Sequence, residues 1–329
     1  MFRRMSTRPR LLDAPAEVVA ALGAALGSAV AREVPAAAGF TPAVASVVAL
    51  ADGREVFVKA SDDPGLHEGL RNAVDCDAAL TDRSLAPPVL ASLACGAWRV
   101  VAWARLPGGH VGRWSSRDVP AVLDLAARLA AATRPCRVPG TVPFPHAFAG
   151  RIGTFQALVS GGRPGPEVDH LAGTPVWSGL DPVRLAALEA GWPLLAEGGH
   201  RRHGHLHHGH LHHGHLHHGD VRRDNLIRGT DGRLRLLDWT HRWTAPGWAD
   251  LVLLMPDLIR DGLDPEPILA ASVWAGAPAH EVNVLLTGLL GYWFNAGHRP
   301  DLPHAPGLRA LQRAQGSACA SWLATRLSR

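Results

Sequence analysis

HGDVRRDN, from His218 to Asn225, is the most informative motif in the sequence. Its pattern is H-x-D-x-x-x-x-N, so Asp220 precedes Asn225 by five positions. The segment LRLLDW follows, and Asp238 stands at the end of the strand that its apolar residues predict. In phosphoryl transfer an aspartate accepts the proton of an attacking hydroxyl, and asparagine and aspartate oxygens hold Mg²⁺. The pattern therefore indicates the chemistry of a phosphotransferase.

The same residue types are common in ordinary loops, because Asp and Asn side chains favour turns. Lys59 adds an independent observation, since it is the single lysine among 33 lysine and arginine residues. It lies in the second strand of a hairpin predicted around Asp52-Gly53, on the strand face opposite Val56 and Val58. This placement favours a phosphate contact. A side chain that merely extends from a strand edge into solvent is the alternative.

A histidine-rich tract precedes the catalytic pattern. Three copies of HGHLH run from His203 to His217, and HGDVR follows as a fourth, altered copy. We interpret the copies as tandem duplications of the loop sequence. Eleven of the 19 histidines lie between His200 and His218, so adventitious nickel or zinc binding is expected. A functional metal site needs fixed ligand geometry, and the repeated glycines disfavour it.

Bulk composition restricts the class of protein. Apolar residues make up 47% of the 329 residues and charged residues 19%, as in globular proteins. The net charge of +4 comes without a basic block, so no nucleic-acid partner is expected. No run approaches the roughly 18 apolar residues of a membrane span, so no membrane partner is expected. Four scattered cysteines without a CxxC pair favour a reduced, cytoplasmic chain.

Regular elements are predicted along most of the chain. Strands are expected within residues 43–60, 87–109 and 225–239, and the first and last of these form hairpins around Asp-Gly turns. Helices are expected within residues 15–28, 65–82, 117–133, 181–199, 281–297 and 307–327. A Pro/Gly-rich connector spans residues 135–179. A β-rich first part and a helical second part predict an α+β fold with two lobes.

These motifs together resemble the aminoglycoside phosphotransferase family, small-molecule kinases with a protein-kinase-like fold. The resemblance is carried by HGDxxxxN, by LLDWTHRWTAPGWADLVLLMP and by GFTPAVASVVALADGREVFVKA. It implies a nucleotide-binding N-terminal lobe over residues 1–105. It also implies a C-terminal catalytic and substrate lobe over residues 106–329, with the His-rich repeat inserted at 200–217. Nucleotide, either ATP or GTP, would then bind between the lobes.

The resemblance also implies a role for individual residues. Asp220 would be the catalytic base, and Asn225 and Asp238 would hold Mg²⁺. Lys59 would contact the α- and β-phosphates, and Glu68 on the following helix would pair with Lys59.

Several supporting groups are implied as well. The stretch Ala102–Leu106 would hold the adenine through its backbone. His218 would hold the catalytic loop by hydrogen bonds, and Asp250 would anchor that loop. If Glu68 does not pair with the lysine, Asp75 or Asp77 is the substitute.

The chain departs from the family in three places. The family usually has a short apolar strand before HGD, whereas here the segment is GHLHHGD with Leu216 as its one apolar residue. Either the duplications moved the original strand upstream, or the repeat supplies it. The phosphate-covering loop AAGFTPAVA has one glycine, Gly39. Histidines titrate near pH 6.5, so the loop beside the active site is expected to gain charge in acid.

The acceptor and the rival functions stay open at this level. A polycationic aminoglycoside needs an acidic pocket, for which the candidates are Asp257, Asp261, Asp264 and Glu266. An amino alcohol, a sugar or another hydroxylated antibiotic is an alternative acceptor. A catalytically impaired pseudokinase and a metal-binding protein built on the histidines are the rival functions. Deletion of residues 203–217 is expected to be tolerated.

Overall fold

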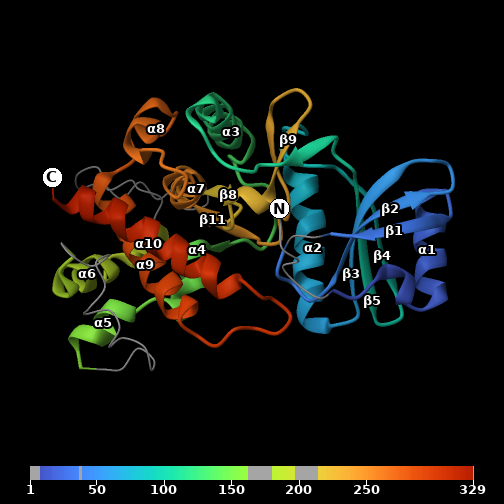
Figure 1. Ribbon diagram of the computed structural model, residues 1–329, viewed down its shortest axis with the longest axis horizontal. Coiled ribbons are helices and arrows are strands. Elements are labelled where there is room, and N and C mark those ends of the chain that lie inside the picture. Colours follow the sequence, from blue (N-terminus) through green and yellow to red (C-terminus); the bar gives the residue numbers. More distant parts are fainter. Residues whose placement is uncertain (1–7, 37–38, 162–179, 197–213, 329) are drawn as a thin grey trace. The chain divides into compact units, whose positions relative to one another are not determined.

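The computed structural model describes residues 8–36, 39–161, 180–196 and 214–328 (Figure 1). They form two compact units. The first unit comprises the described residues up to Val111 together with Arg223–His241 and Asp301–Leu308. The second comprises the described residues in Gly112–Arg222, Arg242–Pro300 and Arg309–Arg329. The chain therefore passes between the units several times, and a division at residue 105 does not describe it fully.

A five-stranded antiparallel sheet forms the centre of the first unit. Its strand order is β1-β2-β3-β5-β4, with strands β1 (Val30–Pro35), β2 (Val44–Leu50), β3 (Glu55–Ser61), β4 (Val89–Cys95) and β5 (Trp98–Ala104). The predicted hairpin joins β2 to β3, and Gly53 in its turn has a φ of +86°. Val56 and Val58 are buried, while Lys59 points to the other face.

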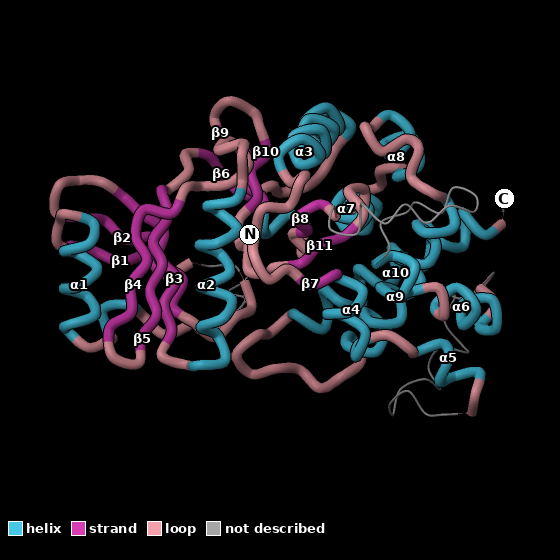
Figure 2. Tube along the Cα trace, turned by 180° about the vertical axis from the view of Figure 1, so that it is seen from behind, coloured by secondary structure: helices cyan, strands magenta, loops and turns pink. Residues whose placement is uncertain are grey.

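Two helices cover the two faces of this sheet. Helix α1 (Ala16–Leu26) packs its apolar residues on the face that carries Val56 and Val58. Helix α2 (Pro64–Ala79) contacts β3 and β5, and Figures 1 and 2 show the sheet between α1 and α2. Asp63 caps α2 by accepting a hydrogen bond from the backbone N–H of Gly65. Lys59 therefore lies on the α2 side of the sheet.

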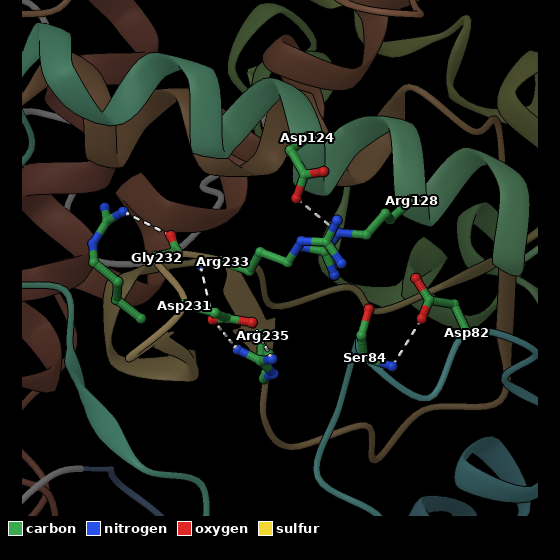
Figure 3. Close-up of polar contacts among 9 residues, drawn as sticks. Asp82, Ser84, Asp124, Arg128, Asp231, Gly232, Arg233 and Arg235 are labelled. Atoms are coloured by element: carbon green, nitrogen blue, oxygen red, sulfur yellow. Dashed lines mark hydrogen bonds and ion pairs between the residues drawn. The ribbon is translucent and has the colours of Figure 1, made fainter.

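A smaller sheet completes the first unit. Strands β9 (Leu226–Gly229) and β10 (Leu234–Leu236) form the second predicted hairpin, and β6 (Gly108–His110) pairs with β9. Figure 3 shows the turn of this hairpin, where the guanidinium of Arg235 lies 2.7 Å from the carboxylate of Asp231. This pairing with β6 assigns the hairpin to the first unit, although it follows the catalytic loop in sequence.

The second unit is mainly helical. Its helices are α3 (Val119–Ala132), α4 (Phe144–Phe148), α5 (Thr154–Val159), α6 (Pro182–Glu189), α7 (Ala249–Ile259), α8 (Pro265–Ala271), α9 (Ala279–Gly297) and α10 (Leu308–Leu327). The residues of α7 from Ala249 to Leu258 are all buried, which makes this helix the centre of the unit. Helices α9 and α10 lie side by side, where the thiol of Cys319 reaches the carbonyl of Leu286. None of the described helices combines the length and the apolar character that a membrane span requires.

The second unit also contains a three-stranded sheet with the order β7-β11-β8. Strand β11 (Trp243–Ala245) lies between β7 (Val142–Pro143) and β8 (His215–His217). It is parallel to β7 and antiparallel to β8. Residues 215–217 belong to the third HGHLH copy of the histidine repeat, so this copy itself supplies the strand before HGD.

Most predicted elements are present, and the differences have local causes. The helix expected within residues 181–199 ends at Glu189, and a 3₁₀ turn, Trp192–Ala196, follows it. Gly191 and Pro193 interrupt the helical pattern, because proline lacks the N–H that a continuing helix needs. The connector from residue 135 contains α4 and α5, which its Pro and Gly content concealed. The predicted α+β fold class is confirmed.

Candidate active site

Lys59 and Asp238 meet in the first unit, although 179 positions separate them in sequence. The ammonium of Lys59 donates a hydrogen bond of 2.5 Å to Oδ1 of Asp238. Both side chains are mostly buried, with exposed fractions of 19% and 29%. Two of the residues that the sequence singled out thus form one ion pair.

Asp238 has an unusual backbone. Its φ of +68° makes it the one non-glycine residue in the described part of the chain with a positive φ. Aspartate is among the few residues that tolerate this region, and such conformations often mark functional sites. The backbone turns there, shortly after the end of β10. The direction of the Asp238 side chain is therefore set by a backbone conformation that is unfavourable for most residues.

The β9–β10 hairpin brings Asn225 near Asp238. Asn225 precedes β9 and Asp238 follows β10, while Leu226 and Leu236 are register partners. The backbone N–H of Leu237 donates a hydrogen bond of 2.8 Å to the carbonyl of Asn225. Asn225 is buried, with 8% of its surface exposed. Both candidate magnesium ligands therefore stand at the same end of one hairpin.

Helix α2 holds the segment that follows Asp238. The amide of Asn72 donates a hydrogen bond of 3.0 Å to the carbonyl of Thr240. The thiol of Cys76 lies 3.4 Å from the carbonyl of His241. The conformation at Asp238 is therefore supported by β9 before it and by α2 after it.

Glu68 is not brought to Lys59. Glu68 lies exposed on α2, and among the described residues the ion-pair partner of Lys59 is Asp238. Of the two proposed substitutes, Asp77 pairs with Arg83 at 3.1 Å. No contact between Asp75 and Lys59 is observed in the described part of the chain. Pairing of Lys59 with Glu68 stays a prediction.

The first residues of HGDVRRDN, up to Arg222, belong to the second unit, where Asp250 at the start of α7 anchors them. Its carboxylate accepts hydrogen bonds from the backbone N–H groups of His218 at 3.0 Å and Gly219 at 3.1 Å. Nδ1 of His217 lies 2.9 Å from the same carboxylate. Burial raises the pKa of Asp250, but the charges and hydrogen bonds of His217 and His218 outweigh it and hold this pKa at about 2. The predicted anchoring role of Asp250 is confirmed.

Asp220 follows directly on this anchored turn. Nδ1 of His218 accepts a hydrogen bond of 3.2 Å from the backbone N–H of Asp220, which confirms the predicted structural role of His218. The carboxylate of Asp220 lies 3.0 Å from the guanidinium of Arg222 and is 42% exposed. The candidate base is thus oriented from both sides and remains open to solvent.

Strand β8 seats the loop from the other side. Leu216 is 2% exposed, and its backbone N–H donates a hydrogen bond to the carbonyl of Thr133. Replacement of the usual apolar strand by HLH is therefore compatible with a packed structure. The rest of the tract, up to residue 213, lies outside the described residues, so the nickel or zinc binding expected of it stays a prediction.

His215 in β8 has a defined tautomer. The hydroxyl of Thr133 donates to the carbonyl of Leu129 at 2.6 Å, so its oxygen must accept from Nδ1 of His215 at 3.0 Å. Burial and the charge of Arg134 lower the pKa of His215 to about 4. This histidine therefore stays neutral near pH 6.5, whereas the histidines of the tract were expected to titrate near that pH.

The four acidic residues considered for a cationic acceptor are engaged in structural contacts of the second unit. Trp114 donates to two of them, from its ring to Asp257 at 3.2 Å and from its backbone to Asp261 at 2.7 Å. Asp264 caps α8. Glu266 accepts hydrogen bonds from the ring of Trp322 and from Arg326. These contacts give no support for an acidic acceptor pocket at this place.

The donor atoms near Lys59 suit a hard cation. The amide oxygen of Asn225 and the carboxylate of Asp238 are the ligand types that Mg²⁺ takes, with phosphate and water oxygens in its other positions. Asp238 already holds a cationic ammonium. In the described part of the chain, no three His, Cys, Asp or Glu side chains gather as a purely protein-made metal site. A magnesium ion shared with a phosphate group fits these residues.

Comparison with known proteins shows the fold. No family model and no curated protein matches the sequence. An aminoglycoside phosphotransferase from Alicyclobacillus acidocaldarius superposes with a TM-score of 0.59 at 16% identity, over 91% of this chain and 92% of that one. A spectinomycin phosphotransferase solved with ADP and spectinomycin gives 0.59 at 9% identity, over 95% and 98%. A choline kinase from Streptococcus pneumoniae gives 0.55 at 14% identity, over 92% and 98%. The two-lobed, protein-kinase-like fold expected from HGDVRRDN is confirmed.

Proposed function

We propose that this chain, which has the fold of aminoglycoside phosphotransferases and choline kinase, is a phosphotransferase. It would move the γ-phosphoryl group of ATP or GTP to a hydroxyl of a small molecule. The observation that carries the proposal is the ion pair between Lys59 and Asp238. A lysine on the third strand and an aspartate after a hairpin are the parts with which protein kinases hold phosphates and Mg²⁺.

The residues of the first unit would bind the donor. Lys59 would contact the α- and β-phosphates, and Asn225 and Asp238 would hold Mg²⁺. Bound Mg²⁺ would neutralise charge on the phosphate oxygens. Glu68 would pair with Lys59 once Asp238 has turned to the metal ion. The backbone of Ala102–Leu106, which includes the end of β5, would receive the base.

Asp220 in the second unit would act on the acceptor. The acceptor oxygen forms a bond to the γ-phosphorus while its proton passes to the carboxylate of Asp220. The bond between the γ-phosphorus and the bridging oxygen breaks, and the nucleoside diphosphate leaves. Arg222 and the anchored turn at His218 would hold Asp220 in position, and positioning supplies much of the rate in this chemistry.

The acceptor is proposed only as a small hydroxylated molecule. The neighbours bind or act on different acceptors, and the acidic residues that a polycation would need are engaged elsewhere. An amino alcohol, a sugar and a hydroxylated antibiotic are therefore the classes to screen.

Calorimetric titration of ATP and GTP, with and without Mg²⁺, tests the proposal. We expect Mg²⁺-dependent binding in the wild-type protein and strong weakening in Asp238→Ala. Asp231→Ala is the matched control, because it removes an aspartate from the turn of the same hairpin. Failure of the wild-type protein to bind either nucleotide would contradict the proposal and favour a pseudokinase. Release of the diphosphate with an acceptor panel then separates an active kinase from a binding protein.

A further inference from the structure

One face of helix α2 lies against the segment that follows Asp238. Gly69, Asn72 and Cys76 occupy this face, at spacings of three and four positions. A Cβ atom added to Gly69 would lie 3.6 Å from Cβ of Thr240. The amide nitrogen of Asn72 donates a hydrogen bond of 3.0 Å to the carbonyl of Thr240. Asn72 therefore places an amide directly against the backbone that follows Asp238.

Thr240 links Asn72 to Asp238 through its two backbone groups. Its N–H donates a hydrogen bond of 2.9 Å to the carbonyl of Asp238, and its own carbonyl accepts from Asn72. Asp238 has a φ of +68°, a conformation that persists in a non-glycine residue only where its surroundings hold it. A shift of Thr240 would therefore move the backbone of Asp238, and with it the carboxylate that holds Lys59 at 2.5 Å. All four residues belong to the first unit.

The oxygen of the same amide is buried without a donor. Asn72 is 7% exposed, and its Oδ1 has no hydrogen-bond partner in the described part of the chain. A buried acceptor without a donor lowers the stability of a fold, whereas an apolar side chain of the same shape avoids this cost. Leucine has nearly that shape and is a better helix former than asparagine. The stability of α2 therefore does not explain this amide, and such local conflicts are typical of functional positions.

We propose that Asn72 is a positioning residue for Asp238. By holding the carbonyl of Thr240, it keeps the backbone of Asp238 in the conformation that directs the carboxylate to Lys59 and to the proposed Mg²⁺. The part that concerns Mg²⁺ rests on the proposed function, whereas the part that concerns Lys59 needs no ligand. Binding of nucleotide with Mg²⁺ should therefore depend on Asn72, and so should the ion pair of the protein without nucleotide.

Amine labelling of the full chain reports on the ion pair, because Lys59 is its single lysine. Acetic anhydride is the reagent, and mass spectrometry of the peptide that contains Lys59 gives the rate. A carboxylate partner slows the reaction, because it favours the ammonium and only the neutral amine attacks. We expect Asn72→Leu to raise the rate by about three- to tenfold, as for the loss of one hydrogen bond. Asp238→Asn gives the rate without the pair, and Leu70→Val, at a buried position of the same helix, is the matched control.

Calorimetry and thermal melts on the same variants complete the test. We expect Asn72→Leu to weaken binding of ATP or GTP with Mg²⁺ by about three- to tenfold and to leave binding without Mg²⁺ unchanged. Its melting temperature should stay close to that of the wild type, because removal of the buried Oδ1 offsets the lost bond to Thr240. A merely structural role of Asn72 would instead lower the melting temperature and leave the labelling of Lys59 unchanged.

The outcomes separate this inference from the proposed function. If Lys59 is labelled equally fast in Asn72→Leu and the wild type, or if Leu70→Val speeds labelling as much, the positioning role is refuted. If labelling speeds up in Asn72→Leu alone but the wild type binds neither nucleotide, the positioning role stands and the proposed function fails. If Asn72→Leu and the wild type bind nucleotide with Mg²⁺ equally well, the role toward the metal ion is refuted. Should Asn72→Leu fold poorly, Asn72→Ala removes the same amide and provides the same comparison.

Discussion

At the scale of single residues, Lys59 is the one lysine in a chain whose other 32 lysine or arginine positions are all arginine. Its ammonium reaches Oδ1 of Asp238 at 2.5 Å from a strand whose opposite face is packed. An ammonium is a compact point charge, whereas a guanidinium is a broad planar fork. We therefore expect the contact with Asp238 to depend on the shape of the cation as well as on its charge.

Lys59→Arg tests the requirement for a compact cation at this position. We expect turnover to fall by roughly a hundredfold, as when one positioned donor is removed from an active site, although the charge is unchanged. The measurement is the steady-state release of nucleoside diphosphate. Arg54→Lys is the reciprocal control in the same hairpin, because Arg54 forms an exposed pair with Asp52. Equal activity of Lys59→Arg and the wild type would show that only charge matters there.

Asp250 carries a second prediction at this scale. Its pKa is about 2 in the folded protein, below the ordinary value of 3.8, so folding favours the charged carboxylate. The resulting stability is present above about pH 4 and is lost as the pH falls through about 2. We expect Asp250→Asn to lower the free energy of unfolding by about 2 kcal/mol at pH 7, and by less at pH 3. Urea unfolding at both pH values measures this, and a deficit independent of pH would contradict the explanation.

At the scale of elements, β8 shows how a duplicated sequence was absorbed into the fold. The third HGHLH copy of the repeat places Leu216 and His217 in buried positions, where His217 contacts the carboxylate of Asp250. The earlier copies are not needed for this strand. The expectation that all three copies can be removed therefore needs revision, because the third copy contains β8.

Two deletions distinguish the copies. Removal of residues 203–212 leaves β8 intact, and we expect the free energy of unfolding to change by less than about 1 kcal/mol, since loop length has a weak effect. Removal of residues 203–217 would place Arg201 and Arg202 where Leu216 and His217 are buried. We expect a loss of roughly 3 kcal/mol or more, because buried unpaired charge is costly. Denaturant unfolding of both variants measures the difference, and unfolding of the shorter deletion would contradict it.

Strand β1 marks a limit of prediction from the sequence. Its buried residue is the charged Glu33, while Val34 is 47% exposed, so the usual pattern of apolar and polar residues is inverted. The sequence could not reveal this, because the burial of Glu33 depends on the N–H groups of Leu11 and Leu12. The hairpins around Asp52-Gly53 and Asp231-Gly232, in contrast, follow from local turn chemistry and were predicted.

The same contrast between local signals and long-range contacts applies to the candidate active-site residues. Lys59, Asn225 and Asp238 could be found from spacing, because motif residues keep fixed places relative to strands and loops. The hydrogen bonds from Asn72 and Cys76 to the segment after Asp238 could not, because they join parts of the chain more than 160 positions apart.

At the scale of the whole molecule, the candidate residues are distributed over the two units. Lys59, Asn225 and Asp238 belong to the first unit, and Asp220 belongs to the second. The chain leaves the second unit between Arg222 and Arg223, so Asp220, the proposed base, and Asn225, a proposed metal ligand, are close in sequence but belong to different units. Donor binding and proton acceptance should therefore be separable by mutation.

Asp220→Asn tests this separation. The substitution keeps the size of the side chain and removes its basicity, so we expect turnover to fall by about 10²- to 10⁴-fold. Mg²⁺ and nucleotide should still raise the melting temperature of Asp220→Asn, because a ligand at a hundred times its Kd stabilises a fold by about 2.7 kcal/mol. Asp238→Ala should lose both turnover and this stabilisation. Thermal melts with and without nucleotide measure the second property. Loss of nucleotide stabilisation in Asp220→Asn would mean that Asp220 also contributes to donor binding. The proposal that the first unit binds the donor and the second unit accepts the proton would then be wrong.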